Sequence, residues 1–202
     1  EELLAKALKH HRHDLVISTK VGYDFYHHTF DTRINGLTQN FEPQFIKYAC
    51  EQSLRRLKTD YIDLYQLNNP ISGTFEEDEL FECLNLLVKE GKIRFFGVSF
   101  DLNGDSLKEA DLQIMKRSII SVQLDYNILE QEPARQLFQN AQKDSVAILT
   151  SRPHSDGTLT EEFNQILRSV PERLSTLYPD VACLESIADK IKSLEFLTTH
   201  HE

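Results

Sequence analysis

The fold follows from one stretch of sequence, residues 61–99, which reads YIDLYQLNNPISGTFEEDELFECLNLLVKEGKIRFFGVS. Its two ends, residues 61–67 and 93–99, are short runs rich in β-branched and aromatic residues, a pattern typical of buried strands. Between them, leucines recur at helical spacing over residues 80–87. The stretch therefore predicts a strand, a helix and a second strand that runs parallel to the first.

Sequence signals also mark the ends of the expected helix. Thr74 and Glu77 match a capping box, in which a hydroxyl and a carboxylate bind free N–H groups at a helix start. Gly91 stands where the end of a helix favours a left-handed backbone. Ser106 and Glu109 repeat the capping box before a later helical pattern.

The same alternation continues on both sides of this stretch. Strand-like runs cover residues 15–20, 119–126 and 146–150, and amphipathic helical patterns separate them. Alternating strands and helices form a parallel sheet, which can be an open doubly wound sheet or a (β/α)8 barrel. The seven glycines contain no G-x-G spacing, so the glycine-rich turn of a nucleotide-binding open sheet is absent. We therefore favour the barrel.

The length of the chain limits how much of a barrel it contains. A complete barrel has about 250 residues and eight strands, whereas this chain has 202 residues and five strand-like runs. We expect an α/β fold in which residues 1–202 form a single incomplete barrel domain, supplying about five central strands and their helices. The only methionine is Met115, so a complete translation product is not expected.

Charge and cysteine content exclude several classes of protein. The net charge of −10 argues against nucleic acid or an anionic membrane as the main partner. No apolar run is long enough for a membrane helix. The three cysteines are odd in number and far apart, which favours reduced thiols in the cytoplasm. The histidine groups match no zinc spacing, so no metal is expected. Oligomeric state is not predicted.

Chemistry is expected where the parallel strands end, because that face carries the active site of a barrel. Lys20 ends an apolar strand, so it should be partly buried and need an acidic partner or a lowered pKa. It could form a Schiff base with a carbonyl, lower the pKa of a neighbouring acid, or simply reach solvent. Asp63 and Asp125 lie inside strands and would also need partners. Residues 21–40 form a long connection at this face, with Tyr23, Phe25, Tyr26 and Phe30 as an aromatic wall.

Several segments, in this order, resemble the aldo-keto reductase family. The resemblance covers roughly residues 1–160. The segments are ISTKVG at 17–22, SLRRLKTDYIDLYQLNNP at 53–70, EGKIRFFGVS at 90–99, VQLDYN at 122–127 and RPHSDGTL at 152–159.

The resemblance implies a (β/α)8 barrel that transfers hydride between NADPH and the carbonyl group of an aldehyde or ketone. The family's catalytic residues are Asp, Tyr, Lys and His. The Tyr is the general acid, the Lys lowers its pKa, the Asp orients the Lys and the His helps to place the carbonyl oxygen. Lys20 falls on the Lys position and Asn68 on the His position, while the Asp and Tyr positions would precede Glu1.

The resemblance also implies cofactor contacts. Ser99 and Gln123 match positions that bind the nicotinamide carboxamide, although without the motifs both would pass for ordinary polar residues of a barrel interior. Ser151 matches a position beside the nicotinamide ring. Arg152 and His154 lie in the loop on the pyrophosphate side and could supply positive charge.

Three functions remain open. The first is an NADPH-dependent reductase of small-molecule carbonyl substrates. The second is a non-catalytic or weakly catalytic NADPH-binding regulatory protein: the amide of Asn68 cannot become cationic, and Phe100 replaces an Asn that contacts the cofactor in the family. Potassium-channel β subunits, a branch of the same superfamily, also carry Asn at the His position. The third is a Schiff-base lyase that uses Lys20.

Overall fold

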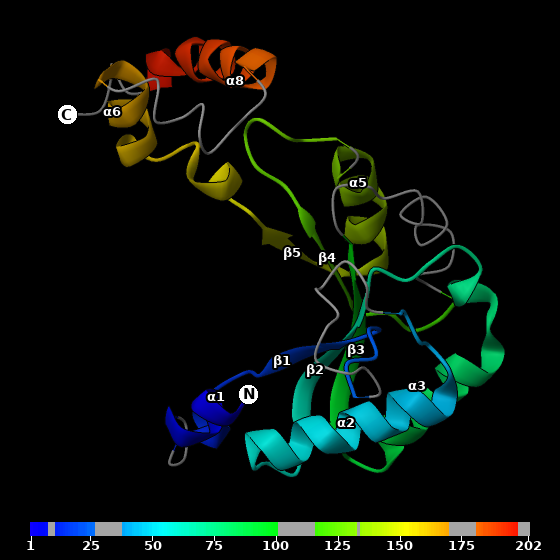
Figure 1. Cartoon of the computed structure of the whole chain (residues 1–202). Helices are drawn as coiled ribbons and strands as arrows, with labels where there is room; N and C mark the ends of the chain where they lie inside the picture. The colour runs from blue at the N-terminus through cyan, green and yellow to red at the C-terminus, as the bar shows by residue number, and fades with distance from the viewer. Residues whose placement is uncertain (8–10, 27–37, 101–115, 133, 170–180, 198–202) are drawn as a thin grey trace. The chain divides into compact units, whose positions relative to one another are not determined.

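Figure 1 shows the computed structural model of this chain, with its described helices and strands. The chain divides into two compact units, which are described separately: Glu1–Leu124 with Pro133–Leu149, and Asp125–Glu132 with Thr150–Glu202. The expectation of a single domain stays a prediction. The described residues are 1–7, 11–26, 38–100, 116–132, 134–169 and 181–197.

The strands form one five-stranded sheet with the order β1-β2-β3-β4-β5. The first four strands pair in parallel, which confirms the predicted alternation of strands and helices. The second strand, β2, is buried along almost its whole length, as expected of a parallel strand covered on both faces. The strands are β1 (Ser18–Val21), β2 (Ile62–Asn68), β3 (Ile93–Phe100), β4 (Ser121–Asp125) and β5 (Ala147–Ser151).

The first strand begins later than predicted, at Ser18 instead of residue 15. Leu15 and Val16 are exposed to 39% and 80%. The backbone N–H of Ile17 donates to the carboxylate of Asp63 at 2.9 Å, so a side chain satisfies it instead of a neighbouring strand. Regular pairing with β2 therefore starts only after Ile17.

Two helices, α2 (Pro43–Leu57) and α3 (Asp78–Lys89), lie beside each other along one face of β1, β2 and β3 (Figure 1). Pro43 occupies the first turn of α2, where its missing N–H costs nothing. Tyr65 of β2 is buried beneath α2, and its hydroxyl donates to the carbonyl oxygen of Ile46 at 3.2 Å. The helix α5 (Ala134–Asp144) follows β4, and the short helix α1 (Glu2–Ala7) precedes β1.

The predicted capping box is wrong. Thr74 lies in a separate 3-10 turn, Thr74–Glu76, and α3 begins only at Asp78. Glu77 is itself the residue that precedes the helix, and no side chain caps that end. The acidic residues Asp78 and Glu79 in the first turn complement the helix dipole instead. Gly91, by contrast, has φ +72°, which confirms the predicted left-handed helix end.

The second unit contains two helices near the end of the chain. They are α6 (Glu161–Ser169) and α8 (Val181–Ser193). The second capping box, Ser106 with Glu109, falls outside the described residues. Within the described part of the chain, no helix is both long and apolar enough to cross a membrane.

The carboxylate of Asp63 ties the amino ends of three strands together. It accepts hydrogen bonds from Arg12 Nη2 at 2.8 Å and from Arg94 Nη1 at 3.0 Å, besides the bond from Ile17. The side chain of Asp63 is 6% exposed. Both guanidinium groups lie over the ring of Tyr61, 3.8 Å and 4.4 Å from its centroid. Sequence analysis expected Asp63 to need partners, and the structure supplies them.

Replacing Asp63 should therefore destabilise the sheet. We expect Asp63→Asn to lower the free energy of unfolding by about 3 kcal/mol, because it leaves two guanidinium groups without their carboxylate. Urea unfolding measures the change, and the exposed Asp60→Asn serves as the matched control, with an expected effect of about 0.5 kcal/mol or less. Equal effects of the two substitutions would contradict the assigned role.

Cys50 in α2 should resist thiol reagents. It is completely buried, and this burial raises the pKa of its thiol to about 12. Since only the thiolate is nucleophilic, we expect alkylation at pH 8 to spare Cys50 until the protein unfolds, as peptide mass spectrometry would reveal. Burial raises the pKa of the Cys50 thiol above the usual value of 9.0, so the folded protein favours the neutral thiol. The stability that depends on the neutral thiol should therefore be present below pH 9 and lost as the pH rises toward 12. Rapid labelling of the folded protein at Cys50 would refute the burial.

Candidate active site

Three polar side chains form a row across the carboxyl ends of β2, β3 and β4. Asn68 is the pairing partner of Ser99, and Ser99 is the pairing partner of Gln123. Paired residues of parallel strands point to the same face of a sheet, at a lateral spacing of about 4.8 Å. Ser99 is buried, while Asn68 and Gln123 are partly accessible. The structure therefore brings together three of the residues predicted from sequence.

Lys20 lies on the same face, one layer below this row. It pairs with Gln66 of β2, two residues before Asn68, which corresponds to about 6.6 Å along the strand. Lys20 is exposed, so the expectation that it is partly buried is wrong. The reason is its position on β1, which is at the edge of the described sheet and pairs only with β2. Its four-carbon side chain is long enough to approach the row from this position.

Gln66 was not predicted from the sequence as a residue of this face. Its side chain is 1% exposed. Its amide oxygen accepts a hydrogen bond from the hydroxyl of Ser18 at 2.9 Å, and its amide nitrogen donates to the carbonyl oxygen of Val98 at 3.4 Å. Gln66 thus links all three strands β1, β2 and β3 directly beside Lys20.

Gly97 has no side chain, and Ser121 of the neighbouring strand fills the space beside it. A Cβ atom at Gly97 would lie 2.2 Å from the hydroxyl oxygen of Ser121 and 2.7 Å from its carbonyl oxygen. The hydroxyl oxygen of Ser121 is buried and makes no hydrogen bond with the part of the chain that the structure describes. A glycine inside a strand pattern can indicate such a close approach, but the sequence does not reveal the neighbour.

Gly97→Ala should destabilise the protein by about 1–3 kcal/mol, because the added methyl group overlaps with Ser121. The double substitution Gly97→Ala with Ser121→Ala should recover only part of this loss, because the carbonyl oxygen of residue 121 stays in place. Ser121→Ala alone should be neutral or stabilising, since it removes a buried hydroxyl that has no hydrogen-bond partner among the described residues. Thermal unfolding of the three variants measures these effects. A fully tolerated Gly97→Ala would disprove the close approach.

The segment after β1 places aromatic rings near Lys20. The rings of Phe25 and Tyr26 lie 4.3 Å apart, and the guanidinium of Arg56 in α2 lies within 6 Å of both. Arg56 also donates to the hydroxyl of Tyr26 at 3.1 Å and pairs with the carboxylate of Glu1. Burial raises the pKa of Tyr26, although its hydrogen bond with Arg56 opposes the shift.

A cavity of about 270 Å³ lies among these side chains. Lys20, Tyr23, Phe25 and Tyr26 all contribute to its lining, so these rings form part of the aromatic wall predicted for residues 21–40. Phe30, the fourth aromatic residue of that prediction, falls outside the described residues. Substrate-sized groups could therefore meet aromatic surface and an ammonium group at one place.

Phe100 does not face the polar row. It follows Ser99 and therefore points to the opposite face of the sheet. There it is 4% exposed, and its ring centroid lies 6.3 Å from that of Phe75. The residue that the family resemblance aligns with a cofactor contact is a core residue here.

In the second unit, Ser151 and Arg152 bind carboxylates. The hydroxyl of Ser151 donates to Asp125 at 2.6 Å, and Arg152 Nη1 donates to the same carboxylate at 3.3 Å. Arg152 Nε donates to Asp156 at 2.8 Å, and Nη2 donates to its second oxygen. The hydrogen bonds that Arg152 donates, those to Asp156 first and that to Asp125 second, raise the pKa of its guanidinium. His154 is exposed at the start of the 3-10 turn Ser155–Gly157.

These contacts answer one question that the sequence left open. The sequence indicated that Asp125 would need partners. Its side chain is 9% exposed, and its partners in the structure are Ser151 and Arg152. Arg152 does not present an unpaired positive charge, because two carboxylates surround its guanidinium. The predicted role of Arg152 toward a phosphate therefore stays a prediction.

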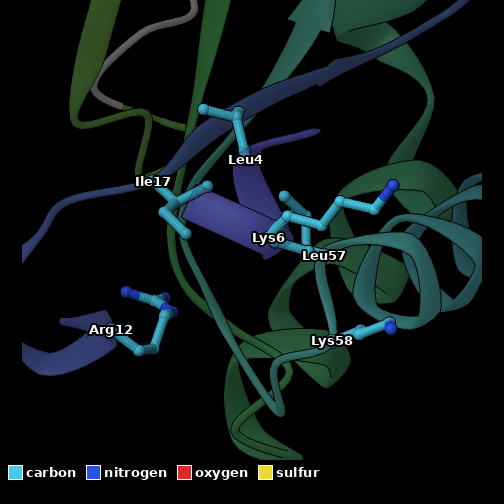
Figure 2. Close-up of a pocket in the computed structure, with 7 residues that line it drawn as sticks. Leu4, Lys6, Arg12, Ile17, Leu57 and Lys58 are labelled. Atoms are coloured by element: carbon cyan, nitrogen blue, oxygen red, sulfur yellow. The ribbon is translucent and has the colours of Figure 1, made fainter. Parts of the chain in front are cut away.

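Another cavity, of about 390 Å³, lies at the amino ends of the strands (Figure 2). Its walls include Leu4, Ile17 and Leu57. Arg12 and Lys58 also line it, but Figure 2 shows them on opposite sides of the cavity. Arg12 is already bound to Asp63. Since the active face of a barrel is at the carboxyl ends, this cavity does not belong to the candidate active site.

A parallel α/β sheet with polar side chains gathered at its carboxyl ends is the architecture of a barrel enzyme. The model of the aldo/keto reductase family matches residues 1–201. The chain belongs to this family, which confirms the fold class: it supplies five parallel strands and their helices of a (β/α)8 barrel.

Individual relatives agree with this assignment. The chain is 32% identical over 164 residues to the uncharacterized oxidoreductase YqkF of Bacillus subtilis, covering 80% of this chain and 49% of that protein. It is similar to the holo form of the aldo-keto reductase AKR11C1 from Bacillus halodurans, with a TM-score of 0.67 and 34% identity over 79% of this chain and 50% of the other. An aldo-keto reductase from Klebsiella pneumoniae in complex with NADPH matches with a TM-score of 0.58 and 26% identity, over 78% and 49% of the two chains. The chain thus spans about half the length of its relatives.

Proposed function

We propose that this chain is part of an NADPH-dependent oxidoreductase that reduces the carbonyl group of small aldehydes or ketones. The observation that carries the proposal is the row Asn68, Ser99 and Gln123, with Lys20 on the same face one layer below. Family membership and the NADPH complex of the Klebsiella pneumoniae relative support the choice of reaction and cofactor.

The donor set of the row fits a nicotinamide. The carboxamide of that ring is neutral and has both donor and acceptor atoms, so it pairs best with neutral groups of the same kind. Ser99 offers a hydroxyl and Gln123 an amide, on adjacent strands in register. We assign these two residues to the carboxamide.

Reduction adds a hydride to the carbonyl carbon and a proton to the carbonyl oxygen, giving an alcohol. NADPH bound beside this row would supply the hydride and would be oxidised to NADP⁺. The side-chain amide of Asn68 donates a hydrogen bond that orients the carbonyl oxygen. The ammonium of Lys20 stabilises the anion of the acid that gives up the proton, which the family resemblance identifies as a tyrosine in a segment preceding Glu1.

In the second unit, we propose that Ser151, Arg152 and His154 take part in cofactor binding. Hydrogen-bond donors and a guanidinium suit the phosphate groups of a dinucleotide.

A single domain and a cytoplasmic location also remain predictions, which rest on the strand pattern and on the cysteine content of the sequence.

Asn68 and Phe100 favour a second candidate function, that of an NADPH-binding regulatory protein. An amide cannot act as a cationic donor or pass on a proton, and Phe100 is packed in the core against Phe75. A protein with these two features could bind NADPH and turn over carbonyl substrates slowly or not at all. It would then act as a cofactor-dependent regulatory protein.

NADPH binding to the purified protein tests the proposed row. We expect Gln123→Ala to weaken binding about three- to tenfold, the effect of one lost hydrogen bond to the carboxamide. Quenching of cofactor fluorescence gives the dissociation constant. Gln142→Ala, at an exposed position of α5, is the matched control and should leave binding unchanged.

The outcome separates the two functions. In the full-length protein, steady consumption of NADPH with a small aldehyde supports the reductase, and binding without consumption supports the regulatory protein. Absence of NADPH binding by the unaltered protein contradicts both.

A further inference from the structure

Asp156 occupies the side of the Arg152 guanidinium that a phosphate would use. Arginine binds phosphate best through two parallel N–H groups. On Arg152, one such pair consists of Nε and Nη2, and these atoms donate to the two carboxylate oxygens of Asp156. The remaining nitrogen, Nη1, points to the carboxylate of Asp125.

The two carboxylates differ in their access to water. Asp125 is 9% exposed and also accepts the Ser151 hydroxyl, so it is a fixed partner of Arg152. Asp156 is 60% exposed. An exposed carboxylate loses little when it returns to water, because surface ion pairs contribute little to stability. Asp156 is therefore the partner that another anion can replace.

The backbone of the loop holds this pair in place. Arg152, Ser155 and Asp156 all have positive φ angles, of +53°, +47° and +51°. A positive φ angle is unfavourable for each of these non-glycine residues. Hydrogen bonds from Ser155 N–H to the Arg152 carbonyl at 2.9 Å and from Gly157 N–H to the His154 carbonyl at 3.0 Å offset this cost. The turn brings positions 152 and 156 together independently of any ligand.

The charges around Arg152 affect whether an anion can bind to it. At formal charges, the group formed by Arg152, Asp125 and Asp156 carries one net negative charge. In this state it repels an anion. Removing Asp156 from the guanidinium would leave Arg152 balanced by Asp125 alone and open its paired N–H groups.

We propose that Asp156 is an internal competitor for the phosphate site of Arg152, and that a phosphate group of the cofactor binds by displacing it. The inference rests on the proposed function, since NADPH supplies the phosphate. The exchange replaces one anion by another at the same two N–H groups and leaves the contact with Asp125 intact.

The substitution Asp156→Asn tests the competition. Asparagine tolerates positive φ, so the turn is retained while the competing charge is lost. We expect the dissociation constant of NADPH to fall about two- to fivefold, the size of an exposed ion pair. Asp60→Asn makes the same charge change at an exposed position in the first unit and should have no effect. In an Arg152→Gln background, Asp156→Asn should no longer strengthen binding.

Calorimetric titration with inorganic pyrophosphate separates this inference from the proposed function. If the unaltered protein binds NADPH and Asp156→Asn binds it equally or less tightly, the competition is refuted while the proposed function stands. If no variant binds NADPH, the proposed function fails and pyrophosphate decides the inference. Tighter binding of pyrophosphate by Asp156→Asn then supports the competition, and unchanged or absent binding overturns it.

Discussion

The carboxylate of Asp63 is the constraint on which the rest of the described sheet depends. It accepts a backbone N–H just before β1, a guanidinium from Arg12 and another from Arg94 at the start of β3. These contacts fix where β1 and β3 begin relative to β2. Side chains alternate between the two faces of a strand, so a slip of one residue would turn every side chain to the other face. The shared face of Lys20, Asn68 and Ser99, at the opposite end of these three strands, depends on this register.

The proposed chemistry relies on neutral groups in one unit and on balanced charges in the other. The row of Asn68, Ser99 and Gln123 contains only hydroxyl and amide groups, which can recognise a carboxamide without a buried charge to compensate. Arg152 is held by Asp125 and Asp156, so its charge is compensated before any ligand arrives. Lys20 differs from both cases, because its ammonium is exposed on a strand with one neighbour. It is the group whose environment would change most if another strand paired with β1.

Most of the strands and several helices could be predicted because their signals are local. Apolar alternation and helical spacing gave the order of the elements, and Gly91 ends its helix with positive φ as expected. The capping box at Thr74 and Glu77 was wrong, because four residues cannot tell a 3-10 turn followed by a helix from one continuous helix. The start of β1 was also misplaced. A distant carboxylate, that of Asp63, takes the backbone N–H that the pattern assigned to strand pairing.

The sequence alone determined the alternation of strands and helices, the barrel class through its ordered motifs, and the residue types at the ends of the strands. These features depend on periodicity and on short motifs, which need no knowledge of distant neighbours. Only the tertiary structure decided that Ser121 leaves no room for a side chain at residue 97, that Gln66 links three strands, and that Asp156 occupies Arg152. Each of these depends on which atoms meet across strands or across a turn, and a linear pattern does not contain that information.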